Sequence, residues 1–314
     1  MEENVENEIK LLLGGVIPER SQEMTEYLDK YTPYFARCDD RDGFLTEAGA
    51  YGILKFTQRT MNIMWIIGFA ANQALNSYSS ILALLRLNGK AIDLKEIRNI
   101  PGQKSEIDKY KELIQSAYTL SKVEKVELFK WPKGVPFPEK GKPSDIEGAT
   151  TFDLICMSGA YVFLHEMKHI AFYEDGNAPS EPHEEEIQCD LFAQSMMLDN
   201  LEKYAEQSGY ELRRLVSKRA MAISLALFYM LVITPLESWA GSETHPSIST
   251  RIRTMINNLS INDDDIFWLY ISPVFLAHLE YLGEEDVVIE FNSLKELAMA
   301  LVEMIERKCI QQIA

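Results

Sequence analysis

One apolar stretch of the chain carries two histidines and a glutamate at a helical spacing. From Tyr161 the sequence reads YVFLHEMKHIAF, and the preceding TTFDLICMSGA is also largely apolar. This pattern predicts a mostly buried helix on which His165 and His169 lie one turn apart on the same face. Buried imidazoles and carboxylates need polar partners. The fold must therefore bring further polar side chains to this helix.

His165, Glu166 and His169 form an H-E-x-x-H motif. This spacing lets two imidazoles hold one metal ion, while the glutamate reaches a water on that ion without binding it. Zinc polarises a carbonyl group and lowers the pKa of such a water to about 7. Glu166 would accept the proton of the water and pass it to the leaving amine. The alternative is a surface helix with two incidental histidines.

A catalytic zinc needs a third protein ligand and an open position, and three residues are candidates for that ligand. Asp175 stands six residues after His169, but a ligand at that spacing normally follows a glycine turn, and Phe172 occupies its place. His183 is expected near the start of a helix. Glu186 is the third candidate and the one we favour.

Glu186 is favoured by the residues that share its face of a predicted helix, Asp190 and Ala193. Asp190 could accept a hydrogen bond from the free ring nitrogen of a zinc-bound histidine and so fix its tautomer. Ala193 would let two helices approach closely. We attribute the neighbouring Glu184 and Glu185 to the helix dipole, which favours acidic residues in a first turn.

A later run, SETHPSISTRI, contains His245 and Arg251. His245 precedes Pro246, so extended or turn backbone is expected there, and a helix can begin at the proline. Either the histidine or the arginine could stabilise the oxyanion of a tetrahedral intermediate. The alternative is a helix N-terminus that carries a solvent-exposed histidine.

These motifs, at residues 165–169, 186–193 and 245–252, follow the order H-E-x-x-H, E-x-x-[small]-D-x-x-A and H-P-x-x-x-x-R-I. In this order they resemble the gluzincin metallopeptidases of the HtpX type. Cys189 stands where that group usually has alanine, and it should pack similarly. The resemblance implies zinc ligation by His165, His169 and Glu186, a general base in Glu166, and roles at the site for Asp190, His245 and Arg251.

The layout of the chain is similar to that of the Lit phage-exclusion peptidases, cytoplasmic proteins with one H-E-x-x-H. That resemblance implies a cytoplasmic zinc endopeptidase, with a translation factor such as elongation factor Tu as a candidate substrate. No secretory signal is recognisable in the acidic MEENVENEIK start, which favours the same location. A net charge of −17 argues against a nucleic-acid partner.

The hydrophobic pattern predicts a mainly α fold (α+β) with a zincin-like core and a small β-sheet. Helices are expected over 44–87, over 104–121 and from 150 onward. We place an N-terminal helical region at 1–122 and the catalytic region at 123–314, within one continuous globular unit.

VELFKW at 126–131 predicts a strand, because it is short, alternating and followed by proline and glycine. In gluzincin-like enzymes an edge strand near the metal holds the substrate in extended form. The resemblance therefore makes 126–135 the candidate for that strand.

Residues 220–236 carry no charged side chain and are expected to form a buried core helix. Their length is also at the lower limit for crossing a membrane. A membrane-spanning helix here would suggest a membrane-associated HtpX-like protease, but it would separate the two halves of the site. Further alternatives are a non-catalytic zinc-binding regulator and a helical scaffold without a metal.

Overall fold

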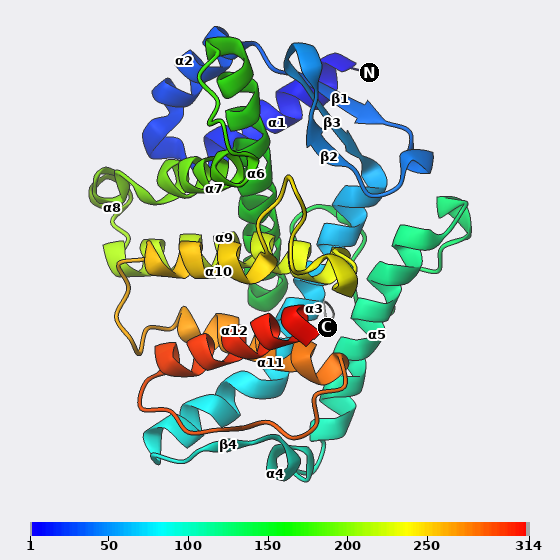
Figure 1. Ribbon diagram of the computed structural model, residues 1–314, viewed down its shortest axis with the longest axis vertical. Coiled ribbons are helices and arrows are strands. Elements are labelled where there is room, and N and C mark those ends of the chain that lie inside the picture. The colour runs from blue at the N-terminus through cyan, green and yellow to red at the C-terminus, as the bar shows by residue number, and fades with distance from the viewer. Residues whose placement is uncertain (1, 312–314) are drawn as a thin grey trace.

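The computed structural model describes residues 2–311, and the fold is mainly helical with a small sheet, as the sequence predicts (Figure 1). The helices are α1 (Glu2–Val16), α2 (Ser21–Tyr31), α3 (Gln58–Leu87), α4 (Leu94–Arg98), α5 (Gln103–Lys122), α6 (Ile146–Asp175), α7 (Pro182–Leu198), α8 (Leu201–Ser208), α9 (Leu212–Ile233), α10 (Ile248–Asn257), α11 (Trp268–Tyr281) and α12 (Leu294–Gln311). The strands are β1 (Tyr34–Cys38), β2 (Thr46–Ala48), β3 (Ile53–Thr57), β4 (Ile92–Asp93) and β5 (Val288–Ile289).

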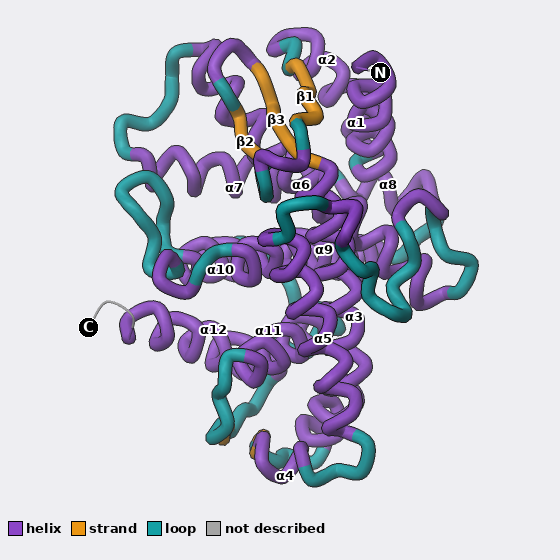
Figure 2. Tube along the Cα trace, turned by 90° about the vertical axis from the view of Figure 1, so that its right-hand side faces the viewer, coloured by secondary structure: helices purple, strands orange, loops and turns teal. Residues whose placement is uncertain are grey.

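The three-stranded sheet has the order β1-β3-β2 and lies beside α6 (Figure 2). Strand β1 runs parallel to β3, and β2 runs antiparallel to it as an edge strand. Phe35 and Phe56 are buried and meet Phe163 of α6 edge to face, with ring centroids 6.1 and 5.4 Å apart. The prediction of helix from residue 44 was therefore wrong, because 46–48 and 53–57 form strands.

Two helices of 30 residues each, α3 and α6, form the centre of the molecule. Helix α6 packs against α7 and α9, whereas α3 packs against α5 and α11. The two central helices cross closely at Gly68, where a Cβ atom would stand only 2.3 Å from the side chain of Ile155. Elements before and after residue 122 thus pack on one another, and the helix that carries the H-E-x-x-H motif lies between them.

The apolar segment at 220–236 falls mostly within α9, which is long and apolar enough to cross a membrane. However, 72% of its most apolar window is buried inside the protein. The helix contacts α6, α7 and α10, which carry the site described below. Its burial agrees with the expected core helix.

The strand predicted at 126–131 is absent. Val126–Leu128 form a single 3₁₀ turn, and the chain continues as an irregular segment. Pro132 and Pro136 lack the N–H groups that a strand ladder needs. Instead, Trp131 Nε1 donates to the carbonyl of Val135 at 2.9 Å, which folds the segment on itself. The proposed substrate strand at 126–135 was therefore also wrong, since these residues do not line the catalytic cleft.

His278 on α11 is buried among aromatic rings. It stacks on Trp239 and Tyr281, and the hydroxyl of Tyr110 lies 3.2 Å from its Nδ1. Burial, with no carboxylate to offset it among the described residues, lowers its pKa to about 3. The imidazole is therefore neutral in the folded protein near neutral pH.

This burial predicts an acid sensitivity of stability. As the pH falls below the ordinary histidine pKa of 6.5, the unfolded chain takes up this proton and the folded chain does not. The free energy of unfolding should decrease by about 1.4 kcal/mol per pH unit from this group alone, down to its folded pKa. His278→Gln cannot titrate, so urea unfolding should show a smaller loss of stability on acidification than in the wild type. His183→Gln, at an exposed histidine, is the control, and parallel pH profiles for wild type and H278Q would contradict the prediction.

Candidate active site

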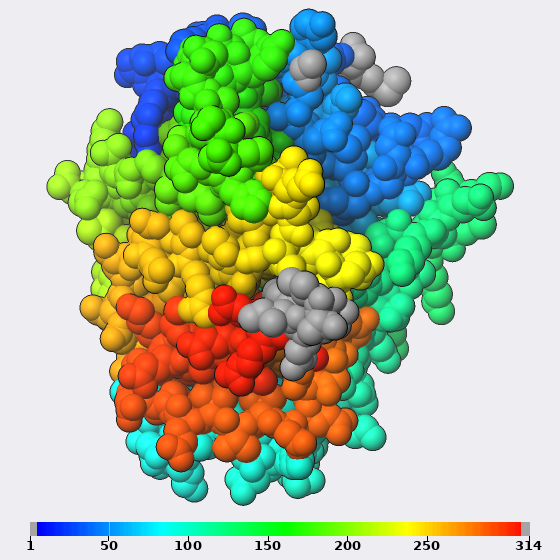
Figure 3. All heavy atoms as spheres, viewed as in Figure 1, coloured from blue at the N-terminus to red at the C-terminus, as the bar shows by residue number. Residues whose placement is uncertain are grey.

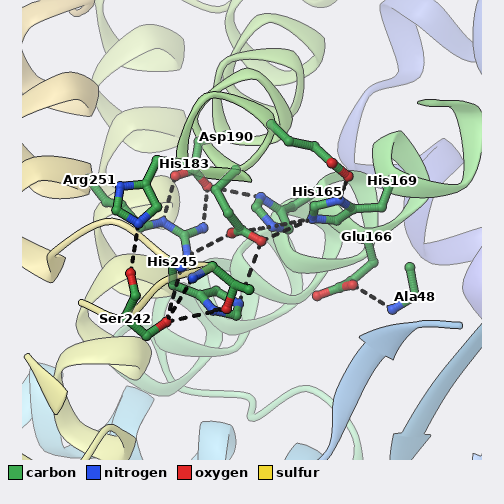
Figure 4. A network of polar contacts seen from close by, with 12 residues as sticks. Ala48, His165, Glu166, His169, His183, Asp190, Ser242, His245 and Arg251 are labelled. Carbon is green, nitrogen blue, oxygen red and sulfur yellow. Dashed lines mark hydrogen bonds and ion pairs between the residues drawn. The ribbon is translucent and has the colours of Figure 1, made fainter. Parts of the chain in front are cut away.

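The two histidines of the H-E-x-x-H motif converge with a glutamate from the next helix (Figure 4). His165 and His169 lie on α6, with their Nε2 atoms 3.3 Å apart. One carboxylate oxygen of Glu186, on α7, lies 3.4 Å from His165 Nε2, and the other lies 3.4 Å from His169 Nε2. Gly176, at φ +62°, ends α6 and lets the chain turn into α7.

These three side chains fit a tetrahedral metal ion. Nitrogen and oxygen ligands at 2.0–2.2 Å from such an ion lie about 3.3–3.6 Å from one another. The distances of 3.3, 3.4 and 3.4 Å match that spacing. Of the residues considered for the third position, the structure brings Glu186 to the histidines.

The other two candidates lie elsewhere. Asp175, at the end of α6, contacts the hydroxyl of Tyr31 at 2.7 Å and the ammonium of Lys30 at 3.0 Å. His183 Nε2 contacts the carbonyl oxygen of Ser242 at 2.7 Å. Neither belongs to the group that could hold a metal among the described residues.

Each imidazole is oriented from behind by a carboxylate. Nδ1 of His165 lies 2.9 Å from Asp190 Oδ1, and Nδ1 of His169 lies 2.7 Å from Glu185 Oε1. A carboxylate at Nδ1 fixes the tautomer that leaves Nε2 free for a metal. Burial alone would lower the pKa of both histidines, but these carboxylates and Glu186 raise it to about 9.

The sequence interpretation missed the role of Glu185. It assigned this residue to the helix dipole, whereas the side chain contacts His169. The signal in the sequence that could have revealed this role is the position of Glu185 next to Glu186. Neighbouring residues of a helix lie only about 100° apart around its axis. Two adjacent acids at the start of α7 can therefore both border α6.

Arg251 of α10 is buried behind the histidines. Its guanidinium donates to both oxygens of Asp190, at 2.7 and 2.6 Å, and its Nη1 lies 3.3 Å from Glu186 Oε2. Burial would raise the pKa of Asp190, but Arg251 and His165 hold it well below its ordinary value. The arginine thus ties α10 to the two carboxylates of α7.

His245 lies at the exposed side of the cluster, in the loop before α10 (Figure 4). Its Nε2 is 3.6 Å from Glu186 Oε1, and its Nδ1 is 2.8 Å from the hydroxyl of Thr244. Gly241, at φ +92°, makes the turn possible, since a Cβ there would stand 2.6 Å from the carbonyl oxygen of His245. The structure therefore places His245 and Arg251 on different sides of Glu186.

Glu166 faces the sheet. Its Oε2 accepts a hydrogen bond from the backbone N–H of Ala48, on the edge strand β2, at 2.6 Å. Burial is the main cause of its raised pKa, which the two histidines partly counteract. The sequence interpretation gave no hint of Ala48, which lies 118 residues earlier in the chain.

A cleft of about 940 Å³ opens over these residues. Strand β2, α6, α9 and the loop before α10 contribute its walls. Its titratable lining combines four glutamates with Arg251 and the histidines His165, His169 and His245. The acidic residues that line it are Glu47, Glu166, Glu185 and Glu186.

A mainly helical fold with a cleft over an H-E-x-x-H helix is the arrangement of a peptidase. Comparison with family models agrees: residues 54–271 match the model described as Peptidase U49. Because this match covers most of the chain, the protein belongs to the peptidase U49 family. The match supports the peptidase resemblance seen in the motifs, but it does not confirm the HtpX-like detail. No curated protein and no solved structure matches the chain.

The contact of Glu185 with His169 predicts a weaker metal site when this carboxylate is neutralised. Glu185→Gln should lower the affinity for added Zn²⁺ by about tenfold or more, because an orienting carboxylate typically contributes that much. Equilibrium dialysis against competing chelators measures the change. Glu184→Gln is the matched control, since Glu184 contacts Gln188 and not a histidine. Equal affinities in the two variants would contradict the role of Glu185.

Proposed function

We propose that this peptidase is a cytoplasmic zinc-dependent endopeptidase that cleaves a protein substrate. The observation that carries the proposal is the convergence of His165, His169 and Glu186 at 3.3–3.4 Å. Among metals, two imidazoles and one carboxylate suit zinc.

In this proposal His165, His169 and Glu186 hold the ion. Bound zinc supplies an acidified water and polarises the carbonyl group of the scissile peptide bond. Asp190 and Glu185 keep the two imidazoles in the required tautomer. No residue becomes covalently attached to the substrate.

Glu166 acts as the general base and then as the general acid. Its carboxylate would take the proton from the attacking water and deliver it to the amine that leaves. The contact with Ala48 occupies Oε2 and fixes the rotamer of the side chain. The same contact places the reacting carboxylate beside the edge of the sheet.

His245 and Arg251 receive different roles. The exposed imidazole of His245, at the mouth of the cleft, suits an oxyanion that develops on the substrate carbonyl. Arg251 is engaged by Asp190 and Glu186, so we assign it to positioning these carboxylates.

An extended substrate would bind along β2. Only β3 pairs with β2 among the described strands, so the other edge is available for an added strand. The N–H of Ala48 points to this edge but donates to Glu166, so the N–H of Thr46, which by alternation points the same way, is the donor that would pair with the substrate. A scissile bond held there would lie next to Glu166.

Elongation factor Tu is the first candidate substrate to test, on the strength of the resemblance to the Lit peptidases. Cleavage of this factor by the purified protein is measured directly by mass spectrometry.

The membrane-associated alternative predicts that the protein requires detergent for solubility. The regulatory alternative predicts that Glu166→Gln leaves the biological effect intact.

Metal analysis of three proteins tests the proposed site. The wild type should contain about one zinc per chain. Glu186→Ala should lose it, whereas Glu166→Gln should keep the metal and lose a factor of about 10²–10⁴ in kcat. Absence of zinc from the wild type, or full zinc in E186A, would overturn the assignment of ligands.

The edge strand provides a further test. Thr46→Pro removes an outward N–H without removing a bond to β3, because proline is tolerated at sheet edges. We expect kcat/KM for a peptide substrate to fall by about tenfold with little change in melting temperature. Thr46→Ala keeps the N–H and should retain activity. Equal activity of T46P and T46A would show that substrate does not pair with this edge.

A further inference from the structure

The segment that joins α5 to α6 has a charge opposite to that of the protein as a whole. Residues 123–145, between the two helices, contain five lysines, three glutamates and one aspartate, whereas the chain as a whole carries a net charge of −17. Leu128 and Phe137 in the same segment are also exposed, at 76% and 47%. The end of α5 and the start of this segment project from the body of the molecule (Figure 3). Exposed apolar side chains combined with a local excess of basic residues are typical of an interaction surface.

A groove of about 1390 Å³ lies between this segment, α3 and α5. We call it the basic groove. Its lining combines side-chain amides, aromatic rings and four lysines with the carboxylates of Glu112, Asp145 and Glu147. These include Asn72, Gln73, Asn76 and Gln115, the rings of Phe69, Trp131 and Tyr281, and Lys109, Lys111, Lys130 and Lys133.

The outer wall of the basic groove is held in a fixed shape. Trp65 Nε1 on α3 donates to the carbonyl of Pro136 at 2.9 Å, in addition to the bond from Trp131 to Val135. Gly134, at φ +88°, makes the turn between these two prolyl stretches. A surface ordered before binding loses little conformational entropy when a ligand arrives.

Positive charge is available in the basic groove. Lys130 and Lys133 are exposed, and neither makes an ion pair within the part of the chain that the structure describes. Two of the acidic residues in the lining are engaged by N–H donors. Glu147 accepts bonds from the amides of Asn72 and Asn76, and Asp145 caps the N-terminus of α6.

We propose that the basic groove is a docking site for an acidic, extended segment of the protein substrate. The identification of the bound protein as substrate rests on the proposed function. The amide oxygens of Asn72 and Asn76, whose nitrogens donate to Glu147, would accept hydrogen bonds from backbone N–H groups of the segment, and the rings would accept an apolar side chain. Lys130 and Lys133 would pair with its carboxylates.

The shape and charge of the protein favour a peptide over other anions. The site is a groove, whereas a bilayer surface would meet only the exposed tip of the segment. The large negative charge on the rest of the chain opposes long phosphate backbones. A short acidic segment can enter the groove without approaching that charge.

Docking here would be separate from cleavage. Gly148 of α6 lines the basic groove and His165 of the same helix belongs to the catalytic cluster. At 1.5 Å per helical residue the two are about 25 Å apart along α6. An extended chain needs about eight residues to span that distance. A protein substrate can therefore occupy both sites, and a very short peptide cannot.

Binding of a fluorescein-labelled peptide of alternating Glu and Phe tests the proposal. The full-length E166Q protein is used, so that hydrolysis does not interfere. The Glu-Phe peptide should bind, and its Gln-Phe counterpart should bind about tenfold more weakly. Lys130→Glu with Lys133→Glu should reduce affinity for the acidic peptide about tenfold. Lys90→Glu with Lys203→Glu makes the same charge change at two exposed lysines outside the groove and should have little effect.

Each alternative result has a defined meaning. Equal weakening by both lysine pairs would overturn the proposal, because binding would then follow net charge alone. Binding to phosphatidylserine vesicles that K130E/K133E abolishes, without binding of the acidic peptide, would assign the surface to membranes instead. Trp131→Phe provides a second readout, since quenching of tryptophan fluorescence by an unlabelled acidic peptide should largely disappear.

The same lysine variants separate this proposal from the proposed function. In a wild-type background, K130E/K133E should leave cleavage of a very short peptide unchanged. Cleavage of peptides by a wild-type protein that does not bind the acidic peptide would contradict the docking site alone. A protein that binds the acidic peptide but hydrolyses no substrate would contradict the proposed function. The proposed docking site would then still stand.

Discussion

The rest of the site depends on the balance of charge buried between α6, α7 and α10. Two imidazoles and one guanidinium face the carboxylates of Glu185, Glu186 and Asp190 there. Arg251 joins the carboxylate of Asp190 through both oxygens, and Asp190 in turn faces His165. Breaking one member of such a buried group leaves the others without compensation, which costs far more than an exposed pair would. The network therefore holds the three helices in register and fixes the ligand geometry at the same time.

Local spacing explains why much of this site could be predicted. The H-E-x-x-H pattern places His165 and His169 on one helix face whatever the remainder of the fold. The recurrence of an acid at Asp190, one turn after Glu186 and beside apolar residues, indicated a buried face in the same way. Glu185 and the contact of Glu166 with Ala48 were not predicted. The first depends on how α7 rotates against α6, and the second on a strand far earlier in the chain.

The sequence predicted the fold class correctly but placed the strands wrongly, and the two outcomes have related reasons. Long helices carry many periods of apolar residues, so their type is evident from sequence. Strand β2 has three residues, too few for any alternation to be recognised, and β3 alternates only through Leu54 and Phe56. VELFKW alternates as well, but the prolines after it remove the donors that a ladder needs. The alternation of apolar residues alone did not show which short segment pairs with another strand.

The different linings of the cleft and the basic groove have a consequence for orientation. An acidic segment is attracted to Lys130 and Lys133, whereas the cleft presents Glu47 and three further glutamates beside Arg251 and the histidines. A substrate that contains both an acidic segment and a neutral or basic scissile region would therefore be guided in one direction along α6. In the proposed mode of binding, β2 would pair with the substrate backbone and read little of its sequence, so such guidance would supply selectivity that the catalytic residues do not. The catalytic cluster can then remain a general device for peptide hydrolysis, and the choice of substrate can lie in a separate part of the molecule.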